Sequence, residues 1–274
     1  VRQGPVTATP GAGRPLTRSA GLGLGLAMAW FSLLVLIPLA AVVVTATEGG
    51  WSGFAQQLAN EQTQAAIRLT VGTALAVTVV NIVMGTVIAW VLVRDDFWGK
   101  GVLEVLIEIP FALPTIVAGL VLLSLYGNDS PVGINVANQR SSVFLAFLFV
   151  TLPFVVRTVQ PVLAELDREG EEAAASLGAS RLTTFRRITL PAITPAIAAG
   201  AAMSFARGVS EYGSLVLLSG NLPFKTEVTS VRILSSVEND NAAGAAAVAT
   251  VLLVVSLVVI VVFDLIQRRL VRRA

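Results

Sequence analysis

Residues 19–47 read SAGLGLGLAMAWFSLLVLIPLAAVVVTAT, and no charged side chain interrupts this run between Arg18 and Glu48. A helix needs about 20 apolar residues to cross the hydrocarbon core of a bilayer, so the run is long enough to span a membrane. It also exceeds the roughly 7–15 apolar residues of a secretory signal peptide, although a cleaved signal is the alternative interpretation. We expect residues 19–47 to form a first transmembrane helix.

The overall composition agrees with a membrane-embedded chain. Of the 274 residues, 55% are hydrophobic and 13% are charged, whereas charged residues make up about 25% of an ordinary soluble domain. Five further apolar runs predict, with the first, an all-α polytopic fold of six transmembrane helices. These runs are Leu69–Val93, Ile109–Gly127, Ser142–Leu163, Ile193–Ser219 and Ala242–Ile266.

The absence of cysteine and histidine limits the chemistry that the chain can perform. It removes disulfides, thiolate nucleophiles, imidazole bases and nearly all zinc sites. An intramembrane enzyme would need a His-assisted serine, paired aspartates in opposed spans or a metal cluster, and the sequence has none of these patterns. The net charge of +2 does not indicate a nucleic-acid partner. We therefore expect a non-catalytic membrane protein without a metal site.

The basic residues predict the orientation, because cytoplasmic loops of membrane proteins carry an excess of Lys and Arg. If six spans alternate, one side receives both tails and the second and fourth loops, which contain Arg2, Arg14, Arg18, Arg94, Lys100, Arg168, Arg181, Arg186, Arg187, Arg268, Arg269, Arg272 and Arg273. The other side receives Arg68, Arg140, Lys225 and Arg232. Both termini are therefore predicted to be cytoplasmic.

The segments outside the spans differ in character. Residues 1–18 are rich in Pro, Gly and Thr, which predicts a disordered cytoplasmic tail, and residues 268–274 form a basic cytoplasmic tail. The connection GNLPFKTEVTSVRILSSVENDNAAG, residues 220–244, is long enough to contain a helix. We expect it to be structured at the outer surface of the membrane, with a plain linker as the alternative.

The stretch EEAAASLGASRLTTFRRITLP, residues 171–191, predicts a hairpin of two short helices. Good helix formers fill residues 163–177, and Gly178 follows where a left-handed C-cap is expected. Ser180 suits the N-cap of the second helix, which Pro191 is expected to end. Small alanines on the first helix allow a close approach of another protein, so we expect the hairpin to dock into a groove. A hairpin that only caps the bundle is the alternative.

Seven residues of this hairpin follow the order E-A-A, three residues, G, nine residues, I, one residue, L-P. They are Glu172, Ala173, Ala174, Gly178, Ile188, Leu190 and Pro191. This pattern resembles the EAA loop of the permease subunits of ATP-binding-cassette importers. The resemblance implies that the first short helix is a coupling helix, which sits in a cleft of an ATPase subunit and transmits its opening and closing. The resemblance to these permeases extends over residues 63–267, which implies a type I importer transmembrane domain.

Three further segments are similar to the sulfate/thiosulfate permeases of this superfamily, the T-type subunits in particular. They are FALPTIVAGLVLLSLYG from Phe111, FARGVSEYGSLVLLSGNLPFKTEV from Phe205 and NDNAAGAAAVATVLLVVSLVV from Asn239. Molybdate and tungstate permeases share much of a GEYG-like pattern, in which this chain has Ser210 before Glu211. The resemblance therefore implies inward transport of sulfate, and of thiosulfate, by alternating access. An importer of molybdate or tungstate is the alternative.

The resemblance also implies a set of partners in a bacterial inner membrane. They are a second homologous permease, two copies of an ATP-binding-cassette ATPase and an extracytoplasmic sulfate-binding protein. No Walker A pattern occurs in the chain, so we expect ATP and Mg²⁺ on the partner ATPase and no cofactor on this chain. A passive anion channel is a further alternative, but a channel would not need a docking hairpin.

Two charged residues interrupt the fifth apolar run. Arg207 and Glu211 are four residues apart, on one face of a helix, and a pair of opposite charges lowers the cost of placing them near the bilayer interior. They either stabilise helix packing or line the path of an anion together with the hydroxyls of Ser204, Ser210 and Ser214. Such a path must bind its ion weakly, so that the ion can leave.

Two prolines occur near the start of the third apolar run. Pro110 and Pro114 are expected to bend this helix, because each removes a backbone hydrogen bond. The bend is either a hinge for gating or a kink that packing holds fixed.

Overall fold

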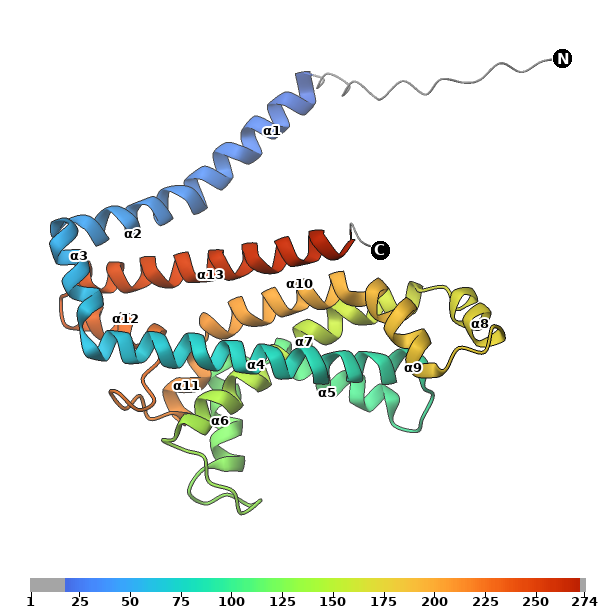
Figure 1. Cartoon of the computed structure of the whole chain (residues 1–274). Coiled ribbons are helices and arrows are strands. Elements are labelled where there is room, and N and C mark those ends of the chain that lie inside the picture. The colour runs from blue at the N-terminus through green and yellow to red at the C-terminus, as the bar shows by residue number, and fades with distance from the viewer. Residues whose placement is uncertain (1–17, 272–274) are drawn as a thin grey trace.

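The computed structural model describes residues 18–271. The predicted disordered tail of residues 1–18 lies outside the described residues except for Arg18, which begins the first helix, and residues 272–274 of the predicted basic tail lie outside them as well. All the described elements are helical, as the apolar runs predict. Figure 1 shows long helices running along one another, with short helices and loops at both ends of the bundle.

The elements follow one another as α1 (Arg18–Phe31), η1 (Ser32–Leu36), α2 (Ile37–Thr47), α3 (Gly50–Ala59), α4 (Glu61–Arg94), α5 (Lys100–Ala112), α6 (Thr115–Tyr126), α7 (Arg140–Glu165), α8 (Glu169–Ser176), α9 (Arg181–Thr184), η2 (Phe185–Thr189), α10 (Leu190–Val209), α11 (Gly213–Leu218), α12 (Thr229–Glu238) and α13 (Ala242–Val271). Both η1 and η2 are π-helical turns. Helix α12 lies within residues 220–244, so the prediction of a structured connection is confirmed.

Five continuous helical segments are long and apolar enough to cross a membrane. They are residues 19–47, 61–94, 140–165, 181–209 and 242–269. The first of them contains the π turn η1, which ends just before Pro38 in the first turn of α2. Since proline lacks an N–H and its ring clashes with the carbonyl of the preceding turn, a wider turn accommodates it without ending the helix.

The third predicted span is not one helix. Helices α5 and α6 meet at an angle of 119° where the single run of residues 109–127 was expected. The break is at Pro114, which has an extended ψ of 135° and follows Leu113 with a ψ of 134°. A residue before proline avoids the helical conformation, which explains the position of the break. Pro110, in contrast, lies inside α5.

The fifth predicted span begins and ends earlier in the chain than expected. Helix α10 ends at Val209, and the chain turns before the short helix α11, so residues 193–219 do not form one helix. The reason is the carboxylate of Glu211, which accepts a hydrogen bond from the backbone N–H of Ser214 at 2.9 Å. This side-chain contact starts a new helix and competes with continuation of the old one.

Glycines bring the central helices α4, α7 and α10 close together. A Cβ added to Gly85 of α4 would lie 2.8 Å from the Cβ of Val155 on α7, and one added to Gly200 of α10 would lie 2.8 Å from the Cα of that same valine. Small residues allow close backbone packing in membranes, where the hydrophobic effect between helices is weak. Val155 is fully buried in one core cluster, and Phe147 of α7 and Phe205 of α10 are fully buried in another.

The two ends of the bundle carry different elements. Figure 1 shows α8, α9, the connection from α4 to α5, the start of α1 and the end of α13 at one end. Helices α3, α11 and α12 and the connection from α6 to α7 lie at the other. This arrangement is the one that six alternating spans predict for the loops with many and with few basic residues.

Candidate functional site

The turn of the hairpin has the geometry expected for Gly178. Its φ is +82°, in the left-handed region. Its N–H donates to the carbonyl of Ala175 at 2.9 Å, and the next N–H, of Ala179, donates to the carbonyl of Ala174 at 3.0 Å. These two bonds form a Schellman motif, which satisfies the last carbonyls of α8. The predicted left-handed C-cap is therefore present.

The second half of the hairpin begins as predicted but does not end as predicted. Ser180 is the N-cap of α9, and its Oγ accepts a hydrogen bond from the N–H of Thr183 at 3.3 Å. Residues 181–209 then form one continuous helical segment through η2. Pro191 lies in the first turn of α10, after the wider π turn, and does not end the helix. Residues 163–177 are not one helix either, because α7 ends at Glu165 and α8 begins four residues later.

The tip of the hairpin presents small and apolar side chains. Leu177 is 89% exposed and Leu182 is 59% exposed. Glu172 and Ala173 of α8 are also exposed, on a helix whose first turn is acidic. Exposed leucines next to small residues are suited to contact with another protein rather than with water.

Glu171 holds the hairpin against the rest of the protein. Its Oε1 lies 2.8 Å from the Nη2 of Arg94, the last residue of α4, and accepts a hydrogen bond from the hydroxyl of Thr189 at 2.8 Å. The side chains of Arg94 and Glu171 are 9% and 22% exposed, so the pair is largely shielded from water. Sequence reasoning missed Glu171, because the recognised pattern begins at the next residue, Glu172.

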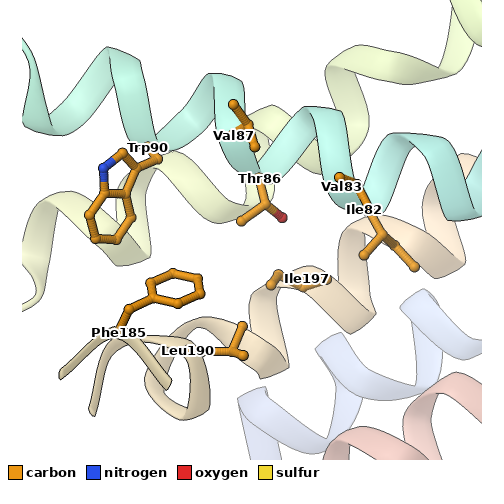
Figure 2. Close-up of a pocket in the computed structure, with 8 residues that line it drawn as sticks. All are labelled: Ile82, Val83, Thr86, Val87, Trp90, Phe185, Leu190 and Ile197. Atoms are coloured by element: carbon orange, nitrogen blue, oxygen red, sulfur yellow. The ribbon is translucent and has the colours of Figure 1, made fainter. Parts of the chain in front are cut away.

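An aromatic contact joins the same elements a turn further into the bundle. Trp90 of α4 and Phe185 of η2 pack edge to face, with ring centroids 5.5 Å apart. The guanidinium of Arg94 lies 5.5 Å from the centroid of the Trp90 ring. Figure 2 shows Trp90 and Phe185 facing each other at one end of an apolar groove of about 310 Å³ between α4 and α10. The hairpin is thus fixed to α4 by charge and by aromatic packing.

The remaining residues of the seven-residue pattern lie where η2 enters α10. A Cβ added to Gly170 would lie 3.8 Å from the Cγ2 of Ile188, so Ile188 packs near the start of α8. Leu190 packs partly buried against the inner core around Val156 and Ile193. Six residues of the pattern therefore lie in or beside the hairpin, and Pro191 lies in the first turn of α10, which leads into the bundle.

The charged residues of the fifth apolar run form an ion pair at the end of α10. The Nη2 of Arg207 lies 2.7 Å from the Oε2 of Glu211, whose side chain is 1% exposed. The other carboxylate oxygen accepts hydrogen bonds from the N–H of Ser214 at 2.9 Å and from its hydroxyl at 2.8 Å. A buried carboxylate is stable only when it is paired and hydrogen-bonded in this way.

The three candidate serines have different surroundings. Ser204 is buried and accepts a hydrogen bond from the Nδ2 of Asn81 at 2.9 Å, and Asn81 also donates to Thr151 at 2.7 Å. Ser210 is exposed and donates to the carbonyl of Arg207 at 3.0 Å. Within residues 18–271, none of the three hydroxyls is hydrogen-bonded to the Arg207 guanidinium. Sequence reasoning also missed Asn81, an amide within an apolar run that could have been noticed.

The break at Pro114 positions α6 against α11. A Cβ added to Gly119 would lie 2.5 Å from the carbonyl oxygen of Ser214, and one added to Gly213 would lie 2.2 Å from the Oγ1 of Thr115. Helices α6 and α11 therefore touch backbone to backbone, directly beside the Glu211 carboxylate.

The chain matches one protein family over residues 81–274, described as the inner membrane component of binding-protein-dependent transport systems. It is 42% identical over 86% of its length to the sulfate transport system permease protein CysT of Synechocystis sp., of which it covers 85%. It is 39% identical over 92% of its length to CysT of Salmonella typhimurium, of which it covers 94%.

The fold is also that of a solved transporter. The structure is similar to a chain in the crystal structure of a bacterial alginate ABC transporter in complex with an alginate-pentasaccharide-bound periplasmic protein, with a TM-score of 0.76 and 18% identity. The similarity covers 91% of this chain and 93% of the other. The family match and the relatives extend over most of the multi-pass chain, which therefore belongs to the family of inner membrane components of binding-protein-dependent transport systems.

Proposed function

We propose that this chain is the membrane-spanning permease subunit of an ATP-driven importer that carries sulfate, and also thiosulfate, across the inner membrane of a bacterium. The observation that carries this proposal is the hairpin of α8 and α9, which exposes Leu177 and is tied to α4 through Glu171. The relatives named as sulfate permeases support sulfate as the cargo. They do not favour molybdate or tungstate, or a passive channel.

The partners follow from the same proposal. The permease pairs with a second homologous permease, and two copies of an ATP-binding-cassette ATPase bind on the cytoplasmic side. ATP and Mg²⁺ bind to the ATPase rather than to this chain. An extracytoplasmic binding protein supplies sulfate from the other side. The description of the family as binding-protein-dependent supports the last of these partners.

The hairpin is the part that responds to the ATPase. Residues 173 and 174 let α8 approach the partner closely, while Leu177 fills an apolar cleft. A push on α8 moves the end of α4 through the Arg94–Glu171 pair, and it moves α10 because α9, η2 and α10 are one helical segment. Rigid-body movement of these helices switches the central path between outward and inward access.

The break at Pro114 is the proposed hinge in this movement. It lies between α5 and α6. Helix α5 is joined to the end of α4 by a short connection, and α6 packs on α11 beside Glu211. A change in the angle between α5 and α6 therefore alters the surroundings of the Arg207–Glu211 pair. Arg207, whose side chain is 28% exposed, supplies positive potential to the passing anion, while Glu211 limits how tightly the anion binds.

Uptake of labelled sulfate tests the function directly. Cells that lack their own sulfate uptake are compared with and without this chain, together with its partner subunits. We expect sulfate accumulation that depends on the chain and resists an excess of molybdate. Accumulation that molybdate abolishes at equal concentration contradicts the sulfate assignment, and accumulation without the ATPase contradicts the proposal of an ATP-driven importer.

A further inference from the structure

A polar pocket of about 430 Å³ lies at the end of the bundle opposite the hairpin. Its walls are the first turns of α4, the start of α7 and the loop of residues 219–228 between α11 and α12. The lining residues include two arginines and one glutamate: Arg68, Arg140 and Glu227. No residue of the proposed coupling site or of the Arg207–Glu211 pair lines this pocket.

Within the part of the chain that the structure describes, both arginines leave most of their hydrogen-bond donors without a partner. Arg68 donates from Nη2 to the Oε1 of Gln64 at 3.2 Å. Arg140 donates from Nε to the carbonyl of Lys225 at 3.3 Å and from Nη2 to the carbonyl of Phe224 at 3.5 Å, which fixes its side chain along the loop. Among the described residues, neither guanidinium forms an ion pair with a carboxylate. Each guanidinium has five N–H donors and is well suited to a planar or tetrahedral oxyanion.

The glutamate in the pocket is buried and faces a neutral partner. Glu227 is 4% exposed, and its Oε2 accepts a hydrogen bond from the Nε2 of Gln62 at 2.7 Å. The two cations outnumber this carboxylate, so the pocket attracts anions. The carboxylate repels an anion at the same time, and the binding that results is weaker than two arginines alone would give.

The loop wall of the pocket is held in a conformation that its residues do not favour. Phe224 has a φ of +62°, which is unfavourable for a bulky side chain. The loop closes on itself because the hydroxyl of Thr226 donates to the carbonyl of Ser219 at 2.6 Å and accepts from the N–H of Leu222 at 3.0 Å. This conformation directs the carbonyl of Lys225 to Arg140. Strained residues held in place by their surroundings are common at binding sites.

The pocket lies near the outer mouth of the bundle. Helix α4 has 34 residues, a length of about 51 Å, whereas the hydrocarbon core is about 30 Å thick. Arg68 is in the second turn of α4, so it lies within about 12 Å of the helix start and near the headgroups. The opposite end of α4 holds Arg94 and the hairpin. A Cβ added to Gly208, the residue after Arg207, would lie 3.7 Å from the Cβ of Ala74, which is six residues further along α4 than Arg68. An anion that arrives from outside therefore meets this pocket before it meets Arg207.

We propose that Arg68, Arg140 and Glu227 form a transient receiving site for a divalent tetrahedral oxyanion on the outer side. This inference rests on the proposed importer function and names the first step of passage. Arg140 is the cation that the loop holds in place, Arg68 is the cation that Gln64 holds from α4, and Glu227 keeps the affinity low enough for release. The pocket is larger than a bare sulfate ion, so the anion keeps part of its water.

Charge-neutral variants test the two arginines in the complete importer, reconstituted in liposomes with ATPase and sulfate-loaded binding protein. Removing one charge-assisted hydrogen-bonding partner, in Arg68→Gln or Arg140→Gln, should lower the sulfate transported per ATP hydrolysed by about tenfold. The stimulation of ATP hydrolysis by the binding protein should stay unchanged. Arg232→Gln is the matched control, because Arg232 contacts Thr63 at 3.5 Å and does not line the pocket.

Two results overturn the proposal. Unchanged transport per ATP in both variants removes the arginines from the path. Loss of ATPase stimulation in step with transport means that they dock the binding protein instead. A wild-type importer that moves no sulfate contradicts the proposed function and not the site, because the same measurement can be made with whichever oxyanion the importer moves.

Glu227→Gln provides an independent measurement. The amide keeps the size of the side chain and its contact with Gln62 while it removes the repulsive charge. Equilibrium binding of labelled sulfate to the purified importer, without binding protein, should become about tenfold tighter, and maximal uptake should become slower. Unchanged or weaker binding in a correctly folded variant overturns the role given to Glu227.

Discussion

The guanidinium of Arg94 and the carboxylate of Glu171 lie 2.8 Å apart, although 77 residues separate them in the chain. Arg94 ends the transmembrane helix α4, and Glu171 lies in the first turn of α8. The hydroxyl of Thr189 binds the same carboxylate oxygen, so a single side chain connects α8 to both α4 and η2. We therefore expect Glu171, rather than the exposed Glu172, to be the mechanical link between the hairpin and the membrane helices.

Glu171→Gln should uncouple ATP hydrolysis from uptake. The amide loses the charge that pairs with Arg94, at a cost of about 1.5–3 kcal/mol, and the hairpin then moves without α4. We expect sulfate uptake to fall by about tenfold or more while assembly with the ATPase persists. Uptake and ATPase rates measured on the same liposomes check this.

Glu169→Gln is the control for that variant. Glu169 lies in the same first turn of α8 and is exposed, and its backbone N–H, rather than its carboxylate, makes the hydrogen bond to Asp167. The control should transport at the wild-type rate. If both variants lose uptake equally, the loss comes from the acidic helix start and not from the pair with Arg94.

The loss of uptake caused by a substitution at Gly178 should depend on how readily the new residue adopts a left-handed backbone conformation. A Cβ at this position would meet nothing within 4 Å, so the cost is conformational and not a clash. Gly178→Ala and Gly178→Asp should leave the protein inserted but reduce uptake, since a left-handed L-residue costs about 1–2 kcal/mol. Gly178→Asn should be milder than Gly178→Ala, because asparagine adopts this conformation more readily. Equal loss in the alanine and asparagine variants would mean that the glycine is needed for contact with a partner instead.

Gly119→Ala should destabilise the fold where α6 meets α11. The new Cβ would lie 2.5 Å from the carbonyl oxygen of Ser214, which is backbone and cannot swing away. We expect a loss of about 1–3 kcal/mol, seen as a lower Tm of the purified protein in detergent. Gly101→Ala in α5 is the control, since its Cβ would meet nothing within 4 Å, and its Tm should not fall. A Tm of the Gly119 variant equal to that of the control would contradict the close packing.

Apolar periodicity and charge predicted the helical fold and the ends of the bundle at which most loops lie, but not the two breaks. The carboxylate of Glu211 starts α11 through Ser214, and this depends on a turn that a hydropathy pattern does not contain. A bend near Pro114 was predicted, but the angle of 119° between α5 and α6 depends on the packing of α6 against α11. Local signals predicted Gly178 and Ser180 because each acts within its own turn.

Local sequence signals could not identify contacts between residues that are far apart in the chain. Glu171 could not be distinguished from Glu172 until Arg94 was seen beside it, and Arg68 and Arg140 are far apart in sequence although they line one pocket. The predicted domain limits of residues 63–267 and the path through Ser204 and Ser210 stay predictions.

Arg207→Gln separates a packing role of the ion pair from a role in the path. The substitution leaves the carboxylate of Glu211 buried without its cation, which costs about 3 kcal/mol when a partner is removed from a buried pair. We expect a lower Tm in detergent and weak uptake. The double variant Arg207→Gln with Glu211→Gln removes both charges and should recover most of the Tm, because the amide can still accept the hydrogen bonds of Ser214. If Arg207 attracts the anion, uptake by the double variant stays low despite the recovered fold, whereas recovery of both Tm and uptake would show that the pair only stabilises the turn between α10 and α11.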